Sequence, residues 1–464
     1  MNRRFYKPIL LVVALGLLVG VSRIQQQLND ARADLGITRL EPLENMPPIL
    51  AFTTQALGGF RGLIANALWV RAMELQEEGK YFEMVQLSDW ISKLEPHFTH
   101  VWLVQAWNMT YNISIKFNNP EDRWRWVLRG IELLRDEGLK YNPNNTLIYR
   151  ELSWFFQHKI GHYLDDHHRY YKLQWYTYMN NLFGGGHPDY DALTNPRTDE
   201  QRETLRILRD HYKMDPEVMQ HVDAEYGPLD WRIPESHAIY WAELGRQTAD
   251  PEHQATVRRS IYQTMKIVFD RGAVVSNPVD NTIMFGPNLD VVANVNRAYE
   301  TMMDVEDYTA EFPKTGHRNF LKKAAYELYL YNRHNQAAHW FNYLKQKYPD
   351  AVDPEMTLEE FTLEEVTEDV GDTDIRSSIS VIRGLLFNRY VQLALGDDAR
   401  AENYYRLARA VHNRHQSIVG ADNQRVALEP FAAINQYIVD QLLDPQQSPL
   451  SPEMQARLRT ALEP

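Results

Sequence analysis

One stretch of 18 residues occurs twice with the same spacing, and this repeat constrains the fold more than any other feature of the chain. Residues 79–96 begin with Gly79 and end with Pro96, and residues 332–349 begin with Asn332 and end with Pro349. A spacing that recurs over a long interval is the mark of a protein built from structural repeats. We therefore expect a repeated helical unit in place of several unrelated domains.

The two stretches resemble the second helix of the tetratricopeptide-repeat (TPR) family. In that family, each 34-residue unit is a pair of antiparallel helices, small residues let the helices approach, and a proline closes the unit. Ala337 and Phe341 stand where the family has an alanine and an aromatic residue. In the first stretch, Met84, Ser88 and Ile91 depart from that pattern, which implies helices slightly farther apart.

Further units are less regular. One runs from Trp102 to Pro143. Its closing proline, Pro143, lies 47 residues after Pro96, which is longer than the family's 34-residue unit, so an extra loop is expected near residues 116–121. Another begins at residue 149, and a last one covers 378–412, where Asn388 and Arg389 are expected to break the first helix. The predicted fold is all-α, a TPR-like α-solenoid with irregular insertions after a transmembrane helix.

The N-terminus is expected to be a membrane anchor. Arg3, Arg4 and Lys7 precede an apolar run at residues 8–21, and no Ala-x-Ala cleavage site follows, which favours an uncleaved anchor over a signal peptide. The positive-inside rule then places the N-terminus in the cytoplasm and the bulk of the chain outside. We expect a single-pass protein of the bacterial inner membrane whose bulk is periplasmic. Gly16-x-x-x-Gly20 has the small-residue spacing that lets membrane helices dimerise, so the sequence also allows a homo-oligomer.

These patterns divide the chain into eight segments. They are a basic cytoplasmic N-terminus (1–7), the transmembrane anchor (8–22), a helical stalk and linker (23–48), TPR-like repeats (49–183), an insertion (184–235), degenerate and TPR-like repeats (236–349), an acidic linker (350–377), and a final repeat with capping helices (378–464).

Charge and composition exclude several functions. The net charge of -13 argues against nucleic acid as a partner, because binding phosphates requires a basic face. The absence of Cys excludes disulfides, thiol nucleophiles and Cys-ligated zinc.

The best candidate for an enzymatic site is a histidine cluster. His158 and His162 lie four residues apart, as two imidazoles on one helix face would, and Asp165 and Asp166 follow. His-Glu-x-x-His is absent, and an Asp at this turn is expected to cap the next helix. A metal-dependent hydrolase at His158 and His162 is thus the alternative hypothesis. We assign no catalytic residue, metal ligand or cofactor.

The first hypothesis is a scaffold that binds a partner protein or peptide in a bacterial envelope complex, such as a secretion or polysaccharide-export machine. A TPR-like array offers a long groove lined by its first helices, and needs no catalytic centre. The candidate partner-binding residues are Asn66, Trp69, Asn108, Arg150, Trp154 and Lys322.

Overall fold

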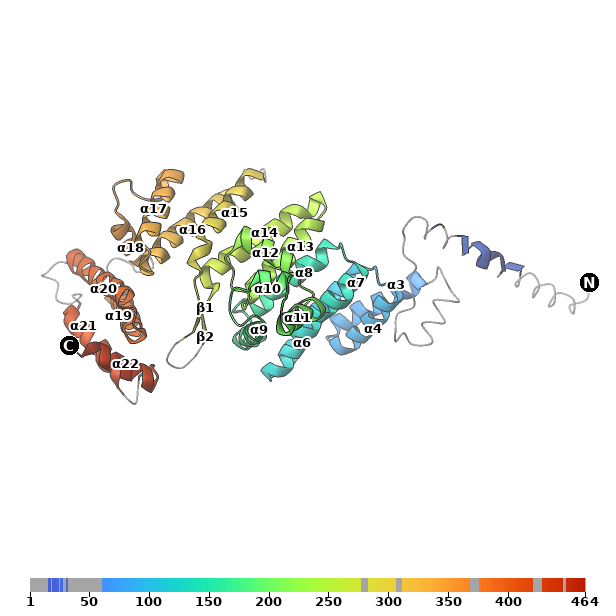
Figure 1. The fold of residues 1–464 in the computed structure, drawn as a ribbon, viewed down its shortest axis with the longest axis horizontal. Helices are drawn as coiled ribbons and strands as arrows, with labels where there is room; N and C mark the ends of the chain where they lie inside the picture. Colours follow the sequence, from blue (N-terminus) through green and yellow to red (C-terminus); the bar gives the residue numbers. More distant parts are fainter. Residues whose placement is uncertain are drawn as a thin grey trace, which may run out of the picture. The chain divides into compact units, whose positions relative to one another are not determined.

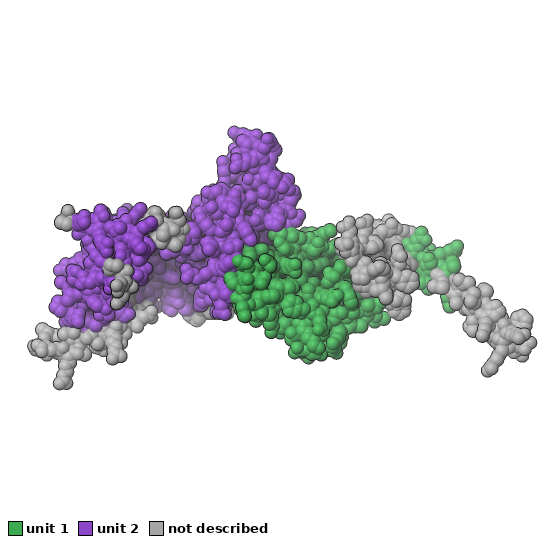
Figure 2. Space-filling model, turned by 90° about the horizontal axis from the view of Figure 1, so that it is seen from below, with its two compact units in different colours: residues 1–151 green, residues 152–464 purple. Residues whose placement is uncertain are grey.

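A computed structural model shows an all-α fold with one short β-hairpin in the residues it describes (Figure 1). The described residues are 16–17, 19–24, 26–27, 31, 61–276, 283–305, 311–367, 375–419, 428–444 and 448–463. The chain separates into two compact units, residues 1–151 and 152–464, which Figure 2 colours green and purple. Each unit is described by itself below.

The first unit consists of helices that pack in consecutive pairs. Segments labelled η are π-helical or 3-10 turns within or beside the α-helices. The elements are α3 (Arg61–Glu77), α4 (Tyr81–Leu94), α5 (Thr99–Trp107), η2 (Asn108–Ile113), η3 (Ser114–Lys116), α6 (Pro120–Glu132), η4 (Leu133–Gly138), α7 (Leu139–Tyr141) and α8 (Thr146–Trp154). Helix α3 packs against α4, α4 against α5, and the α5–η2 segment against α6. The boundary between the units falls within α8.

A close helix crossing explains why one residue of α6 is glycine. A Cβ atom at Gly130 would lie 2.0 Å from Thr110 Oγ1 and 2.8 Å from the Ala106 carbonyl oxygen. No side chain fits in that space, so α6 reaches the α5–η2 segment at a distance that only glycine permits. The small residue at this helix crossing is therefore Gly130, which faces the buried Ala106.

The same turn joins two helices at three places in the chain. Gly79, Asn332 and Gly396 have φ values of 71°, 61° and 83°. In each turn, this residue donates its N–H to the carbonyl three residues earlier, and the next residue donates to the carbonyl five residues earlier, at 2.8 to 3.0 Å. This is the Schellman arrangement, which satisfies the last carbonyls of a helix and requires a left-handed residue. The helix that follows each turn begins two residues later.

The second unit continues with helical pairs and one hairpin. Its elements are η5 (Phe155–Ile160), α9 (His168–Phe183), α10 (Tyr190–Thr194), α11 (Asp199–Arg206), η6 (Ile207–His211), α12 (Pro216–Tyr226), α13 (Pro234–Thr248), α14 (Pro251–Arg271), β1 (Ala273–Ser276), β2 (Ile283–Gly286), η7 (Leu289–Val291), α15 (Val292–Val305), α16 (Glu311–Leu330), α17 (His334–Lys347), η8 (Pro349–Ala351), α18 (Leu358–Thr367), α19 (Ile375–Leu395), α20 (Asp398–Val419), α21 (Phe431–Leu443) and α22 (Pro452–Leu462). The closest pairs are α13 with α14, α16 with α17 and α19 with α20. Strands β1 and β2 pair antiparallel, with Ala273 opposite Gly286.

Buried residues at helical spacing confirm the expected register of the α16–α17 pair. Ala337, Phe341 and Leu344 on α17 are buried, as are Ala324 and Ala325 on α16. The two long repeats also have the same shape, because α4 and α17 are both 14 residues long and begin two residues after their left-handed turns.

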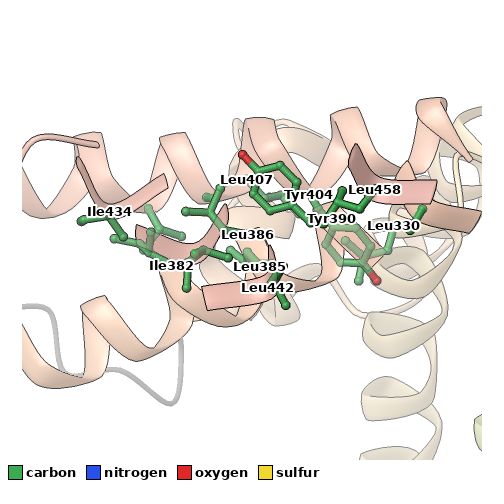
Figure 3. Close-up of a cluster of buried hydrophobic side chains, with 14 of the residues drawn as sticks. Leu330, Ile382, Leu385, Leu386, Tyr390, Tyr404, Leu407, Ile434, Leu442 and Leu458 are labelled. Atoms are coloured by element: carbon green, nitrogen blue, oxygen red, sulfur yellow. The ribbon is translucent and has the colours of Figure 1, made fainter. Parts of the chain in front are cut away.

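The C-terminal helices bury one continuous apolar cluster. Ile382, Leu386 and Tyr390 of α19 meet Leu407 of α20, and α21 and α22 close the cluster with residues such as Leu458 (Figure 3). Both closing helices were expected from the sequence. Asn388 and Arg389 do not break the first helix of this pair, because α19 continues to Leu395. Tyr390, the next residue, is 1% exposed, so the buried face continues through this region.

Two segments expected to lie outside the repeats contain helices, and in the first of them a helix over residues 198–212 was expected. The expected insertion, 184–235, contains α10, α11, η6 and α12, and it buries Leu208, Met219 and Trp231. The expected acidic linker, 350–377, contains α18, where Phe361 is 2% exposed and its ring lies 4.9 Å from that of Phe341. Apolar anchors thus hold both segments against neighbouring helices despite their polar composition.

The expected membrane localisation requires correction. A spanning helix needs about 20 consecutive, mainly apolar residues. Among the residues that the structure describes, no helix combines that length with that apolar character. This finding overturns the expectation of a single-pass inner-membrane protein with a cytoplasmic N-terminus and a periplasmic bulk. The expected anchor at 8–22 lies mostly outside the described residues, as does the stalk and linker at 23–48.

Candidate functional site

Two first helices repeat each other with a period of 47 residues. The α5–η2 segment begins at Thr99 and the α8–η5 segment at Thr146, and each has nine α-helical residues followed by six π-helical ones. An aromatic side chain fixes the start of both. Trp102 donates from Nε1 to the Pro96 carbonyl and Tyr149 donates from its hydroxyl to the Pro143 carbonyl, each at 2.8 Å. The spacing of the two prolines is therefore a structural period.

Equivalent positions on the two segments are buried alike. Val101 and Ile148, which are 47 residues apart, are both completely buried, and so are Ile113 and Ile160 at the other end. Each segment therefore has a defined inner face, and the residues on its other side are available at the surface.

The exposed side of both segments carries stacked rings. Trp107 is 41% exposed and stacks on Tyr111 with ring centroids 5.2 Å apart. At the equivalent positions, Trp154 is 38% exposed and stacks on His158 at 4.4 Å, and His158 stacks on His162 at 5.6 Å. We call these five residues the aromatic stripe. Trp107 and Tyr111 belong to the first unit and the other three residues to the second, and the two tryptophans are 47 residues apart in the sequence.

The spacing of four residues explains why these rings meet. Side chains four positions apart lie on the same face of an α-helix, one above the other. The π-turns, with i→i+5 hydrogen bonds, keep such residues close together. Tyr111, in η2, lies four residues after Trp107, and His158, in η5, lies four residues after Trp154, so both pairs use this geometry.

The histidines of the stripe are neutral at pH 7. Burial lowers the pKa of His158, and the nearby His162 and Lys159 lower it further. Burial also lowers the pKa of His162, with further contributions from Arg271 and Lys172. Because an unperturbed histidine already titrates near pH 6.5, a lowered pKa leaves both imidazoles uncharged at neutral pH. The stripe therefore presents flat, neutral rings.

Beneath the stripe lies a buried ionic network in the second unit. Lys159 Nζ lies 2.7 Å from Asp165 Oδ2, and Asp165 also accepts the backbone N–H of His167 at 2.9 Å. Asp165 thus stabilises the turn before α9, but neither Asp165 nor Asp166 caps that helix as expected, because its N-cap residue is His167, which makes no side-chain cap bond. Lys172 and Arg271 both approach Glu235 Oε1, at 3.7 Å and 3.2 Å. This network orients the η5–α9 turn that carries the histidines.

The same geometry bears on the metal hypothesis. The rings of His158 and His162 stack at an interplanar angle of 20°, so they face each other and do not converge on a shared point. The cations Lys172 and Arg271 lie near enough to His162 to lower its pKa. Across the described ranges, no group of three or more His, Asp or Glu side chains is placed to hold a metal ion.

Four of the six partner-binding candidates lie in the first unit. Asn66 and Arg150 are exposed, on α3 and α8. Trp69 is half-buried and meets Phe98 edge to face, with ring centroids 5.7 Å apart. Asn108 is fully buried and donates to Met84 Sδ at 3.0 Å, while the Asn112 side chain donates to the side-chain oxygen Oδ1 of Asn108. Asn108 therefore stabilises the core and is not at the surface.

The other two candidates lie in the second unit and are not brought together. Trp154 belongs to the aromatic stripe, whereas Lys322, on α16, forms an ion pair with Glu365 at 3.1 Å. Trp107 and Tyr111 were not among the residues predicted from the sequence. The sequence did contain a signal for Trp107: Trp154 follows it by 47 residues, the same interval that separates Pro96 from Pro143.

Comparisons with known proteins add no relative to this picture: no protein-family model and no curated protein matches the chain. The repeat geometry and the aromatic stripe therefore carry the functional argument.

Proposed function

We propose that this protein is a TPR-like helical scaffold that binds an apolar peptide segment of a partner protein on the first helices of its repeats. The observation that carries the proposal is the aromatic stripe, which occupies equivalent exposed positions on two first helices. In TPR-like arrays, the first helices line the binding groove.

The chemistry of the stripe favours such a ligand. Exposed aromatic rings offer large contact areas at a low entropic cost, and Trp and Tyr are enriched among the residues that dominate binding energies. Trp107 and Trp154 are rigidly held, since each stacks on the residue four positions later. Neutral histidines extend this surface without adding charge, so it suits apolar or aromatic side chains of a peptide.

The repeat architecture supports the scaffold part of the proposal. Three equivalent Schellman turns, at Gly79, Asn332 and Gly396, join paired helices of similar design. The close approach at Gly130 and the buried Ala337 provide the small residues that such pairs need. These features support a TPR-like solenoid that has lost much of the family's residue pattern.

Site-specific photo-cross-linking tests the proposal. A photoreactive phenylalanine analogue is introduced at Trp107 or Trp154 in the full chain, expressed in its own cell. We expect both positions to cross-link the same partner protein, because both occupy the same position of the repeated helix. The variant Trp154→Ala, with the photoreactive residue kept at position 107, is expected to reduce this product at least fivefold, since truncating an aromatic hot spot commonly costs more than about 1 kcal/mol.

The matched control places the same photoreactive residue at Leu173, an exposed apolar residue on α9, a second helix. No cross-link to that partner is expected there. Equal cross-linking from Leu173, or a product that Trp154→Ala leaves unchanged, would show that the stripe is not the binding surface.

A further inference from the structure

The ionic network at the η5–α9 turn holds more positive than negative charge. Its side chains in the described ranges are Lys159, Lys172 and Arg271 on one side and Asp165 and Glu235 on the other. Lys159 and Asp165 form a pair at 2.7 Å. Lys172 and Arg271 then share one buried carboxylate, that of Glu235. Because a buried charge is costly unless it is paired, this arrangement favours an added anion.

Both of these cations keep hydrogen-bond donors that Glu235 does not accept. The Lys172 ammonium lies 3.7 Å from Glu235 Oε1, which is too far for a hydrogen bond. Arg271 donates to the same oxygen from Nε alone, at 3.2 Å. An ammonium has three N–H donors and a guanidinium has five. Across the part of the chain that the structure describes, neither side chain has another hydrogen-bond acceptor.

Two imidazoles beside the cations carry buried nitrogens without a partner. Among the described residues, Nδ1 of His162 and Nδ1 of His168 have no hydrogen-bond partner. Lys172 and Arg271 lower the pKa of both histidines, so the four side chains lie in one neighbourhood. His168 and Lys172 are also four residues apart on α9, which puts them on one face of that helix. We call these four residues the cation–histidine cluster.

The cluster has a buried end and a more exposed end. The Lys172 side chain is 7% exposed, and its ammonium lies 5.4 Å from the centroid of the Phe285 ring. The Arg271 side chain, at the end of α14, is 21% exposed, and His162 and His168 are half-buried. A small ion can therefore enter beside Arg271 and the histidines, and the Lys172 charge attracts it from the buried end.

We propose that the cation–histidine cluster binds a phosphate group. A guanidinium matches two phosphate oxygens at once, and an ammonium binds phosphate as a point charge. Each imidazole can carry its proton on Nδ1 and donate a further hydrogen bond. A phosphate group has enough oxygens to accept from all four side chains, whereas a carboxylate has only two. The same chemistry belongs to free phosphate and to a phosphorylated side chain of another protein.

Isothermal titration calorimetry on the full chain tests the site with orthophosphate and with O-phosphoserine, at constant pH and ionic strength. We expect saturable binding of at least one probe, with one site per chain. Arg271→Gln and Lys172→Gln should each weaken it roughly tenfold or more, because each removes a charge-assisted interaction. Tighter binding of orthophosphate identifies the free ion as the ligand, and tighter binding of O-phosphoserine identifies a phosphorylated side chain.

The control is Lys266→Gln, which removes an exposed lysine from α14, the helix that carries Arg271, without touching the cluster. Its affinity for the probe should stay within twofold of wild type. Equal losses in the Lys266 and Arg271 variants would show a general effect of net charge and overturn the site.

Glu235→Gln separates a binding role from a purely structural one. This change keeps the shape of the side chain and removes the negative charge that competes with phosphate for Lys172 and Arg271. Binding should therefore become at least threefold tighter, whatever the stability of the other variants. A network that only stabilises the fold predicts no gain. Absence of saturable binding of both probes to wild type, or a Glu235→Gln variant that binds no more tightly, refutes the proposal.

Discussion

At the scale of single residues, buried histidines show how the tertiary environment controls chemistry. His237 is completely buried, and its Nε2 donates to the Trp231 carbonyl at 2.9 Å. The rings of Phe156, Trp175 and Trp231 surround it. Burial lowers the pKa of His237 to about 4, although the hydrogen bond to Trp231 acts in the opposite direction. The folded protein therefore holds this imidazole neutral.

We expect His237 to make the stability of the second unit depend on pH. Because its pKa is lower folded than unfolded, its contribution is fully present above about pH 6.5 and is lost as the pH falls through about 4. Between pH 7.5 and 5, the loss should be about 2 kcal/mol. Urea unfolding at several pH values measures it. His237→Gln should be less stable at pH 7.5 but lose less on acidification, whereas His339→Gln, at an exposed position, should keep the wild-type profile.

At the scale of elements, the turns between paired helices were the most predictable feature. Gly79 and Asn332 begin the two repeated stretches of the sequence, and the structure places both of them, together with Gly396, in left-handed turns. A turn of this kind is specified locally, because only a few residues tolerate its backbone conformation. The helix α18 was not predicted, since its acidic surface hides its apolar residues, among them the buried Phe361.

The same substitution at two glycines should have opposite effects. Gly396 has φ 83°, so Gly396→Ala forces a Cβ into a left-handed turn and should cost about 1–2 kcal/mol. Gly384 lies in the middle of α19, where an added Cβ meets nothing within 4 Å, so Gly384→Ala should stabilise by up to about 1 kcal/mol through helix propensity. Chemical denaturation of both variants measures the difference. Effects of the same sign would refute this assignment of the turn.

At the scale of the whole molecule, two compact units have separate hydrophobic clusters. In the first unit, Ile91 and Leu94 belong to a cluster built on α3, α4 and the start of α5. In the second, Leu386 and Leu458 belong to the cluster of Figure 3. Separate cores commonly break simple two-state unfolding in chains of this size.

Calorimetry should therefore resolve two unfolding transitions. Leu458→Ala removes a completely buried side chain from α22 and should lower only the transition of the second unit, by about 2–5 kcal/mol. Ile91→Ala should act only on the other transition, for the same reason. Leu462→Ala, on the same helix as Leu458 but 37% exposed, provides the control and should change little. If Ile91→Ala and Leu458→Ala lowered the same transition, the two units would unfold as one.

Sequence alone determined what depends on neighbours along the chain: an all-α fold, the repeated stretches that begin at Gly79 and Asn332, the 47-residue spacing of Pro96 and Pro143, and the closing helices. These follow from helical periodicity and turn chemistry, which act over a few residues. Tertiary structure alone decided which side of each helix is exposed, and hence that Asn108 is buried and Trp107 is at the surface. It also brought Lys172 and Arg271 to the carboxylate of Glu235. Packing between distant helices makes those choices, and no local pattern encodes them.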